Sequence, residues 1–309
     1  MPVSANNPTL PRRARKYIRD HSHLSIEKIV QLIAAGKVRW RTPGQDWAPA
    51  SEETLIFESD EVEVSGQQLV AHKSLGAYLL NKPKGVTCTT SDPRGKQDLR
   101  RWLSDMPPGY FPVGRLDRDT TGALLFCNDG DLSTAVLRPE HKLSKLYWLW
   151  LGEQVTAGDP RIARWLSGMA CKEGTARAEK VSVLHSTPDM SELLVTLREG
   201  KNRQIRRMCR ASDFRLLHLH RKQVGSVSVQ RMEVGELRPL SPGQLSELWR
   251  QAGGVEAVFN AQLLALVHKA GRAAEAGEPL PRLQRWLTEH ESFVARALVQ
   301  ARPGRERAE

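Results

Sequence analysis

One carboxylate in the sequence has the surroundings that a reactive group needs. Asp117 lies in a loop that begins at Gly114 and ends at Gly122, and the apolar run of residues 123–127 follows it. A catalytic carboxylate needs a rigid base and a positive counter-charge. The glycine-bounded loop, the buried strand and a neighbouring arginine supply these features. We therefore predict that Asp117 is a catalytic residue at the entrance of a strand.

A predicted helix with cations along one side is the second candidate. Residues 203–211 place Ile205, Met208 and Cys209 on one helix face. The opposite face carries Arg203, Arg206, Arg207 and Arg210. A solvated basic face would have the same spacing, but no acid occurs in residues 201–212 to pair with these cations. We expect the arginines to meet phosphates or a distant carboxylate.

A lysine and a tyrosine two residues apart form a third candidate. Lys145 and Tyr147 share a face if a strand begins at this point. A tyrosine stacks on a base and a lysine meets a phosphate, so the pair suits a nucleotide. A tyrosine in a strand is also a common core residue, and both interpretations stay open.

The composition favours a polyanionic partner. The 309 residues contain 46 Lys and Arg against 35 Asp and Glu, which gives a net charge of +11. Nucleic acid is the leading expectation, and a basic protein with an unrelated role is the alternative.

Cysteine usage and hydropathy indicate the compartment. The four scattered cysteines form no CxxC pair and have no histidine at ligand spacing, so we expect neither a disulfide framework nor a zinc site. No apolar stretch approaches the roughly 18 residues of a membrane span, and no hydrophobic signal core is present near the start. Residues 1–19 lack acids, which also fits an organelle transit peptide. We expect a cytoplasmic monomer that does not act at a membrane.

Periodicity divides the chain into three domains. Residues 10–66 read as two helices followed by short strands, with Ser25 as a helix cap. Residues 75–250 alternate strands with short helices and show no βαβ repeat, which predicts an α+β domain with a mixed, mainly antiparallel sheet. Residues 254–309 predict a helical extension, with helices at 257–274 and 282–299 and a disordered tail.

Four segments together resemble a known family. They are residues 80–85, the Asp117 loop, the triplet that starts at Lys145 and the run of residues 200–208. In this order and spacing they resemble the bacterial ribosomal-RNA pseudouridine synthases of the RsuA-like branch, over residues 77–248. The resemblance implies the pseudouridine synthase catalytic fold. Residues 10–66 resemble the small alpha-L RNA-binding domain of ribosomal-protein-four type.

The resemblance implies roles for individual residues. Asp117 matches the essential aspartate of the family, Tyr147 the tyrosine that stacks on the target base, and Arg206 the arginine that pairs with the aspartate. If that pair is buried, loss of the arginine would cost roughly 3 to 5 kcal/mol of stability. Leu116 and Leu219 resemble the apolar positions beside the site. The residues expected to contact RNA are Arg115, Lys82, Lys84, Lys145, Lys201, Arg203, Arg207 and Arg210, with Arg13, Arg15 and Arg39 in the N-terminal module.

The implied reaction converts a uridine in ribosomal RNA, free or in a ribosomal assembly intermediate, to pseudouridine. It needs no metal and no small-molecule cofactor. Asp117 would add to C1′ of the ribose or remove a proton from C2′, and both routes stay open.

Two other functions compete with this interpretation. Residues 117–121 also fit DxDxT, the signature of Mg²⁺-dependent phosphatases of the haloacid-dehalogenase type, but no apolar strand precedes them and the parallel α/β rhythm is missing. A non-catalytic RNA-binding or ribosome-assembly protein could share the fold. The target uridine and its ribosomal subunit stay open.

Overall fold

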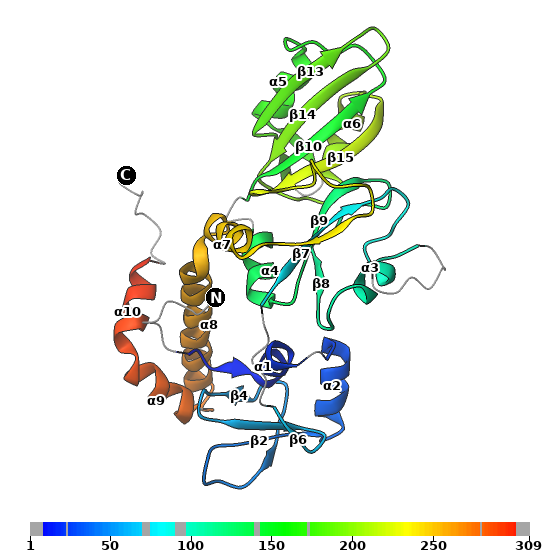
Figure 1. The fold of residues 1–309 in the computed structure, drawn as a ribbon. Coiled ribbons are helices and arrows are strands. Elements are labelled where there is room, and N and C mark those ends of the chain that lie inside the picture. The colour runs from blue at the N-terminus through cyan, green and yellow to red at the C-terminus, as the bar shows by residue number, and fades with distance from the viewer. Residues whose placement is uncertain are drawn as a thin grey trace. The chain divides into compact units, whose positions relative to one another are not determined.

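The chain forms two compact units. The computed structural model describes residues 9–22, 24–69, 75–89, 97–138, 143–171, 174–278 and 280–300. Residues 75–252 form one unit, here called the central unit, and residues 1–74 with 253–309 form the other, the terminal unit. Figure 1 shows the elements of both. The predicted disordered tail, residues 302–307, lies outside the described ranges. Within those ranges, no helix is long and apolar enough to cross a bilayer.

A nine-stranded sheet organises the central unit, in the order β13-β14-β10-β15-β9-β7-β17, with β16 on β15 and β8 on β9. Its strands are β7 (Ala77–Lys82), β8 (Phe111–Val113), β9 (Thr121–Cys127), β10 (Lys145–Leu151), β13 (Lys180–Ser186), β14 (Ser191–Leu197), β15 (Leu216–Val224), β16 (Val227–Ser228) and β17 (Leu237–Pro239). Among its described pairings only β9 with β15 is parallel. The prediction of a mixed, mainly antiparallel sheet is therefore confirmed.

Helices cover parts of this sheet. They are α3 (Arg100–Ser104), α4 (Gly130–Leu137), α5 (Pro160–Ser167), α6 (Gln204–Ala211) and α7 (Pro242–Gln251). In a separate two-stranded sheet, β11 (Met169–Cys171) pairs antiparallel with β12 (Gly174–Ala176). Ile205, Met208 and Cys209 of α6 are buried in one core with Leu149 of β10 and Trp165 of α5. The predicted apolar face of α6 is confirmed, and it holds that helix against the sheet.

The parallel pairing of β9 with β15 depends on one glycine. Gly122 pairs with Arg221 and has a φ of +100°, which lies in the region that favours glycine. A Cβ at this position would collide with the backbone carbonyl oxygen of Arg221. The close approach brings the loop before β9, which carries Asp117, alongside β15.

The N-terminal part of the terminal unit matches the predicted elements. It contains β1 (Arg12–Arg13), α1 (Ala14–His21), α2 (Ile26–Ala34), β2 (Val38–Arg41), β3 (Ala48–Pro49), β4 (Leu55–Ile56), β5 (Glu61–Val64) and β6 (Gln67–Gln68). A four-stranded sheet has the order β3-β2-β5-β6, and β1 pairs with β4. Ser25 caps α2, because its side chain accepts a hydrogen bond from the backbone of Lys28. Ile18, Ile29 and Val38 lie in the core of this module.

The C-terminal helices share a core with the N-terminal residues. These helices are α8 (Gly254–Glu275), α9 (Pro281–Glu289) and α10 (Glu291–Gln300). Leu263 and Leu283 are buried in one cluster with Leu10, and Leu55 packs against it. The helix predicted at 282–299 is two helices, since the chain leaves helical geometry at His290. The extension is therefore part of the terminal unit.

Candidate active site

Most of the predicted site residues line one cavity in the central unit. This cavity has a volume of about 550 Å³, and its walls come from the loop before β9, the start of β10, the loop before α6 and β15. The predicted residues that line it are Arg115, Leu116, Asp117, Lys145, Tyr147, Lys201, Arg203, Arg206 and Leu219. Segments separated by up to about a hundred residues therefore meet here, as the resemblance implied.

Two arginines hold Asp117. Nε of Arg206 lies 3.2 Å from Oδ2 of Asp117, and the Arg203 guanidinium lies 3.4 Å from the same oxygen. Arg206 also donates to Oγ1 of Thr120 at 3.0 Å, so its guanidinium spans the loop. The Asp117 side chain is 26 % exposed. The carboxylate is thus paired with positive charge, held in place and still open to a substrate.

A buried lysine stabilises the backbone of the loop that carries Asp117. Lys82 has no exposed surface, and its ammonium donates to the carbonyl oxygens of Pro83 and Val86 at 2.9 Å and of Arg118 at 3.3 Å. The prediction that Lys82 contacts RNA is therefore wrong, because all three hydrogen bonds are internal. The backbone N–H of Thr120 closes the turn by donating to the Asp117 carbonyl at 3.0 Å.

The start of β10 carries the tyrosine and the lysine on one face. Tyr147 lines the cavity and also packs against the core that contains α6, and its stacking on a base stays a prediction. The Lys145 ammonium donates to the Leu143 carbonyl at 3.2 Å. Burial, and to a lesser degree the charge of Arg221, lower the pKa of Lys145 to about 8.

Three arginines of the cavity lining were missed from the sequence, Arg138, Arg198 and Arg221, and Arg221 is the buried one. Arg221 is buried, lines the cavity and donates from Nε to the Ala123 carbonyl at 2.7 Å. It bonds to β9 just after the glycine crossing and so ties the two parallel strands together. The available signal was its position two residues after Leu219, in phase with the buried face of β15.

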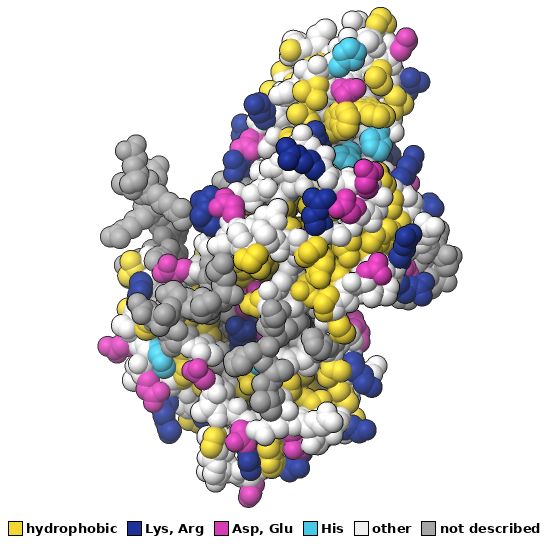
Figure 2. Space-filling view, viewed as in Figure 1, with side chains coloured by type: hydrophobic (Ala, Val, Ile, Leu, Met, Phe, Trp, Pro, Cys, Tyr) yellow, Lys and Arg dark blue, Asp and Glu magenta, His cyan; other side chains and the backbone are white. Residues whose placement is uncertain are grey.

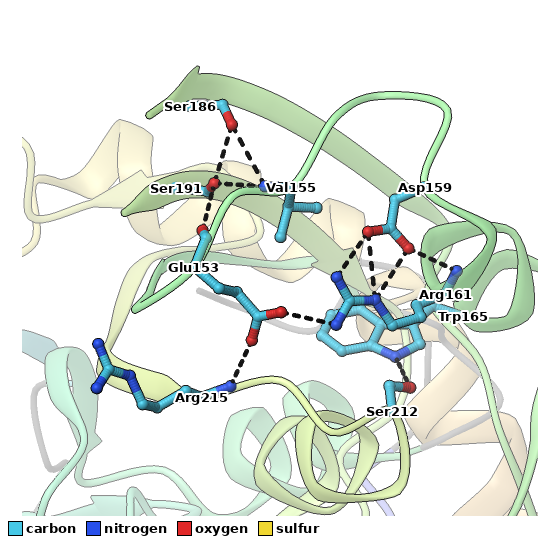
Figure 3. A network of polar contacts seen from close by, with 9 residues as sticks. All are labelled: Glu153, Val155, Asp159, Arg161, Trp165, Ser186, Ser191, Ser212 and Arg215. Atoms are coloured by element: carbon cyan, nitrogen blue, oxygen red, sulfur yellow. Dashed lines mark hydrogen bonds and ion pairs between the residues drawn. The ribbon is translucent and has the colours of Figure 1, made fainter. Parts of the chain in front are cut away.

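A polar network anchors the far end of α6 (Figure 3). Glu153 accepts hydrogen bonds from the Arg215 backbone at 2.9 Å and from the Arg161 guanidinium at 2.7 Å. Trp165 of α5 donates from its indole to the Ser212 hydroxyl at 3.0 Å. Both contacts hold the segment that follows α6. The helix that presents Arg206 is therefore fixed at the end remote from the cavity.

The near end of α6 begins with a strained residue. Arg203 adopts a left-handed backbone conformation, with a φ of 50°, and no side chain caps the helix there. A non-glycine residue in this conformation is uncommon and is concentrated at functional sites. The backbone N–H groups at the start of the helix also give this end partial positive charge beside Asp117.

The other predicted RNA contacts lie elsewhere. Lys84 is exposed but is not among the cavity residues, and neither are Arg207 and Arg210. The three arginines of the terminal unit that were predicted to contact RNA have acidic partners: Arg13 with Glu53 at 2.7 Å, Arg15 with Glu52 at 3.0 Å and Arg39 with Glu63 at 3.5 Å. Their charge is compensated within the unit, and their contact with RNA stays a prediction.

The donor set of the cavity suits acid–base or nucleophilic chemistry at a carboxylate. One anion is aimed by two guanidinium groups, with an aromatic ring and a lysine beside it. No cluster of three or more His, Cys, Asp or Glu side chains with metal-binding geometry occurs in the described part of the chain. The parallel α/β sheet that a phosphatase of the haloacid-dehalogenase type needs is absent from the central unit as described.

Comparisons with known proteins agree with this geometry. Residues 77–211 match the family model of RNA pseudouridylate synthases. An uncharacterized RNA pseudouridine synthase of Mycobacterium bovis is 33 % identical over 62 % of this chain and 76 % of its own. Ribosomal large subunit pseudouridine synthase B of Bacillus subtilis is 29 % identical over 76 % of this chain and 95 % of its own. Ribosomal small subunit pseudouridine synthase A of Vibrio cholerae is 29 % identical over 77 % of this chain and 100 % of its own.

A solved structure shows the same similarity. The crystal structure of a pseudouridylate synthase superposes with a TM-score of 0.53 at 26 % identity, over 76 % of this chain and 99 % of that one. The family model, the curated relatives and the fold agree with one another. The chain belongs to the RNA pseudouridine synthase family, in its RsuA-like branch.

Proposed function

We propose that this protein isomerises a specific uridine of ribosomal RNA to pseudouridine, with Asp117 as the catalytic carboxylate. The observation that carries the proposal is the meeting of Asp117, Arg206 and Tyr147 at one cavity. Relatives named for both ribosomal subunits support ribosomal RNA as the substrate class.

The chemistry follows from the position of the carboxylate. The reaction breaks the bond between N1 and C1′, turns the uracil, and joins C5 to C1′, while the C5 proton is lost and N1 gains one. Asp117 adds through Oδ to C1′ as a nucleophile, or removes the C2′ proton as a base. Both routes need an ionised Asp117 oxygen against the ribose. The guanidinium groups of Arg203 and Arg206 hold that oxygen in position. Tyr147 supplies the aromatic face for the detached base.

Binding requires the uridine to leave its stack. Extrusion of a nucleotide costs a few kcal/mol, about what a small set of phosphate contacts returns. Arg115, Lys145 and Lys201 are among the cations that line the cavity and are placed to make those contacts. Lys201 is also paired with Glu199 at 3.2 Å, so its contribution depends on exchange of that partner for a phosphate.

Tritium release from ribosomal RNA labelled at C5 of uridine tests the proposal. Asp117→Asn should bind RNA and fold normally but release no tritium, because an amide is neither base nor nucleophile here. Asp119→Asn is the matched control, since Asp119 is exposed and two residues away; it should release tritium at the wild-type rate. Turnover by Asp117→Asn would refute the assigned role.

The same assay separates the enzyme from a non-catalytic RNA-binding protein of the same fold. A wild-type protein that binds ribosomal RNA and releases no tritium from either subunit RNA would establish the second function. Pseudouridine mapping in ribosomal RNA, from cells with and without this gene, then identifies the target uridine.

A further inference from the structure

Aromatic side chains gather on the sheet face that points away from α5 and α6. Along β10, Leu149 and Leu151 enter the core, so the alternating Trp148 and Trp150 lie on the opposite face, where both are partly exposed. Along β15 the same alternation places His218 and His220 beside them. Figure 2 shows hydrophobic and histidine side chains together at the surface over these strands. We call these four residues the aromatic face.

The rings of the aromatic face are held in place by contacts with one another. Trp148 meets Trp150 edge to face at 5.3 Å between ring centroids, and Trp150 lies 5.2 Å from His218. The Trp148 indole donates to Glu192 at 3.1 Å, and Thr121 Oγ1 lies 2.8 Å from Nδ1 of His220. The rings are therefore ordered before any ligand arrives, which lowers the entropic cost of binding.

The aromatic face combines neutral rings with unpaired cations. Burial lowers the pKa of His220 to about 4 and also lowers the pKa of His218, so both rings are neutral near pH 7. The Lys222 ammonium lies 5.4 Å from the Trp148 ring. Among the described residues, neither Lys222 nor Lys84 has an acidic partner within 4 Å. Neutral planar rings with free cations beside them suit bases and phosphates of a single strand.

The aromatic face is continuous with the catalytic loop. Thr121, which contacts both histidines, directly follows Thr120, the hydrogen-bond acceptor of Arg206. The positive charges of Lys84 and Arg206 act on His218. The cavity residues Tyr147 and Leu219 lie on the other face of the sheet, so a strand whose uridine occupies the cavity would reach the aromatic face by passing over the loop that carries Asp117 and Thr120.

We propose that the aromatic face binds unpaired bases of the RNA strand that flanks the target uridine, by stacking on Trp148 and Trp150 with Lys222 at a phosphate. The proposal rests on the proposed function, because it takes RNA as the substrate. A protein partner would use the apolar area of the rings, but it would leave the cations unexplained. The unpaired lysines therefore favour a polyanion.

Fluorescence anisotropy with two short probes tests the proposal. One probe is an oligouridine of about twelve nucleotides, and the other has the same length with abasic riboses throughout. Trp148→Leu should weaken binding of the oligouridine about tenfold and leave binding of the abasic strand unchanged, because only the bases stack. Trp148→Phe, which keeps an aromatic ring, should restore most of the affinity. Lys222→Gln should weaken binding of both probes. It should also reduce the slope of log affinity against log salt concentration by about 0.7, the value for one phosphate contact on a single strand.

Leu184→Ala is the matched control, because Leu184 is an exposed apolar residue of β13 without a ring, 54 % exposed; it should bind like wild type. Wild-type affinity of Trp148→Leu, or an equal loss on both probes, would overturn the proposal. Loss of a concentration-dependent dimer in sedimentation, with RNA affinity unchanged, would instead assign the face to a second copy of the chain. Binding needs no turnover, so failure here is distinct from failure of the tritium assay.

Discussion

At the scale of single residues, the partial exposure of Asp117 changes the expected cost of losing Arg206. The carboxylate is 26 % exposed and keeps Arg203 as a second partner. The cost of 3 to 5 kcal/mol for an unpaired buried charge therefore does not apply. We expect Arg206→Ala to lower the free energy of unfolding by about 1 to 2 kcal/mol, the low end for a hydrogen bond to a charged group, because Arg203 remains as a partner.

Activity should fall much further, by about a hundredfold in kcat, since the arginine aims the reacting oxygen. Urea unfolding and tritium release measure the two effects. Arg206→Lys should recover stability more than activity, because an ammonium replaces the charge but not the fork that reaches both Asp117 and Thr120. A variant that loses stability and activity in equal measure would contradict this division.

Lys145 should make RNA binding depend on pH. Burial brings its pKa down to about 8, so the folded protein loses this proton as the pH rises through 8, whereas an unfolded lysine keeps it to about 10.4. Only the charged form attracts a phosphate. We therefore expect RNA affinity to fall about tenfold between pH 7 and 9. Lys145→Arg, which does not titrate there, should flatten the profile measured by anisotropy; an unchanged slope would exclude Lys145 as its cause.

The meeting of Asp117 with Arg206 at one cavity could be predicted from the sequence because each lies in a locally distinctive segment. Asp117 follows a glycine in a charged loop before an apolar run, and Arg206 belongs to a helix without acids. Lys82 and Arg221 were misjudged for one shared reason. A cation in a sequence is usually taken as exposed, yet both are buried by the packing of β7, β9 and β15. The alternation after Leu219 was a weak signal for Arg221, and no local pattern indicated the burial of Lys82.

At the scale of elements, the anchoring of α6 rests on Arg161. Its guanidinium bonds Asp159 and Glu153 and lies 4.0 Å from the Phe214 ring, in the segment that follows α6. Arg161→Ala should destabilise the central unit by about 1 to 3 kcal/mol at pH 7. The substitution should also reduce kcat, although Arg161 does not contact the substrate, because α6 loses a constraint at its far end.

The loss of stability in Arg161→Ala should itself depend on pH. Hydrogen bonds from Arg161 lower the pKa of Asp159 in the folded protein. The stabilisation is therefore present above the ordinary aspartate pKa of about 4 and is lost as the pH falls through the folded-state value. Thermal unfolding of both proteins from pH 7 to pH 3 should show the difference shrinking below about pH 4. A constant difference would assign the effect to lost packing on Phe214.

Element type was predictable wherever the apolar period was clear, as along β10 and α6. Boundaries and partners were less so. The break at His290 has no proline or glycine beside it, and the helical period continues on both sides, so residues 282–299 read as one helix. The pairing of β9 with β15 requires a glycine at position 122, because Arg221, about a hundred residues away, approaches it closely. No local pattern shows this requirement.

At the scale of the whole molecule, the two ends of the chain build one unit. The exposed pairs in it, Arg13 with Glu53 at 2.7 Å and Arg15 with Glu52 at 3.0 Å, contribute little because solvent screens them. Arg282 of α9 is different. Its guanidinium lies over the rings of Trp40 and Phe57 and bonds Asp60 at 2.7 Å, and the Asp60 side chain has no exposed surface. A residue of the C-terminal extension thus compensates a buried charge of the N-terminal module.

Arg282→Ala should therefore lower the free energy of unfolding of the terminal unit more than a substitution at an exposed position does. The Asp60 carboxylate would keep the hydrogen bonds from Thr42 and the Phe57 backbone but lose its cation, at a cost of about 3 to 5 kcal/mol. Hydrogen exchange of the β2 and β5 amides measures this, with the amides of β10 as the internal reference for the central unit. Arg285→Ala, in the same helix at an exposed position, should change exchange by no more than about 0.5 kcal/mol. Equal protection in both variants would show that the module folds without the extension, and that Asp60 is compensated by its remaining donors.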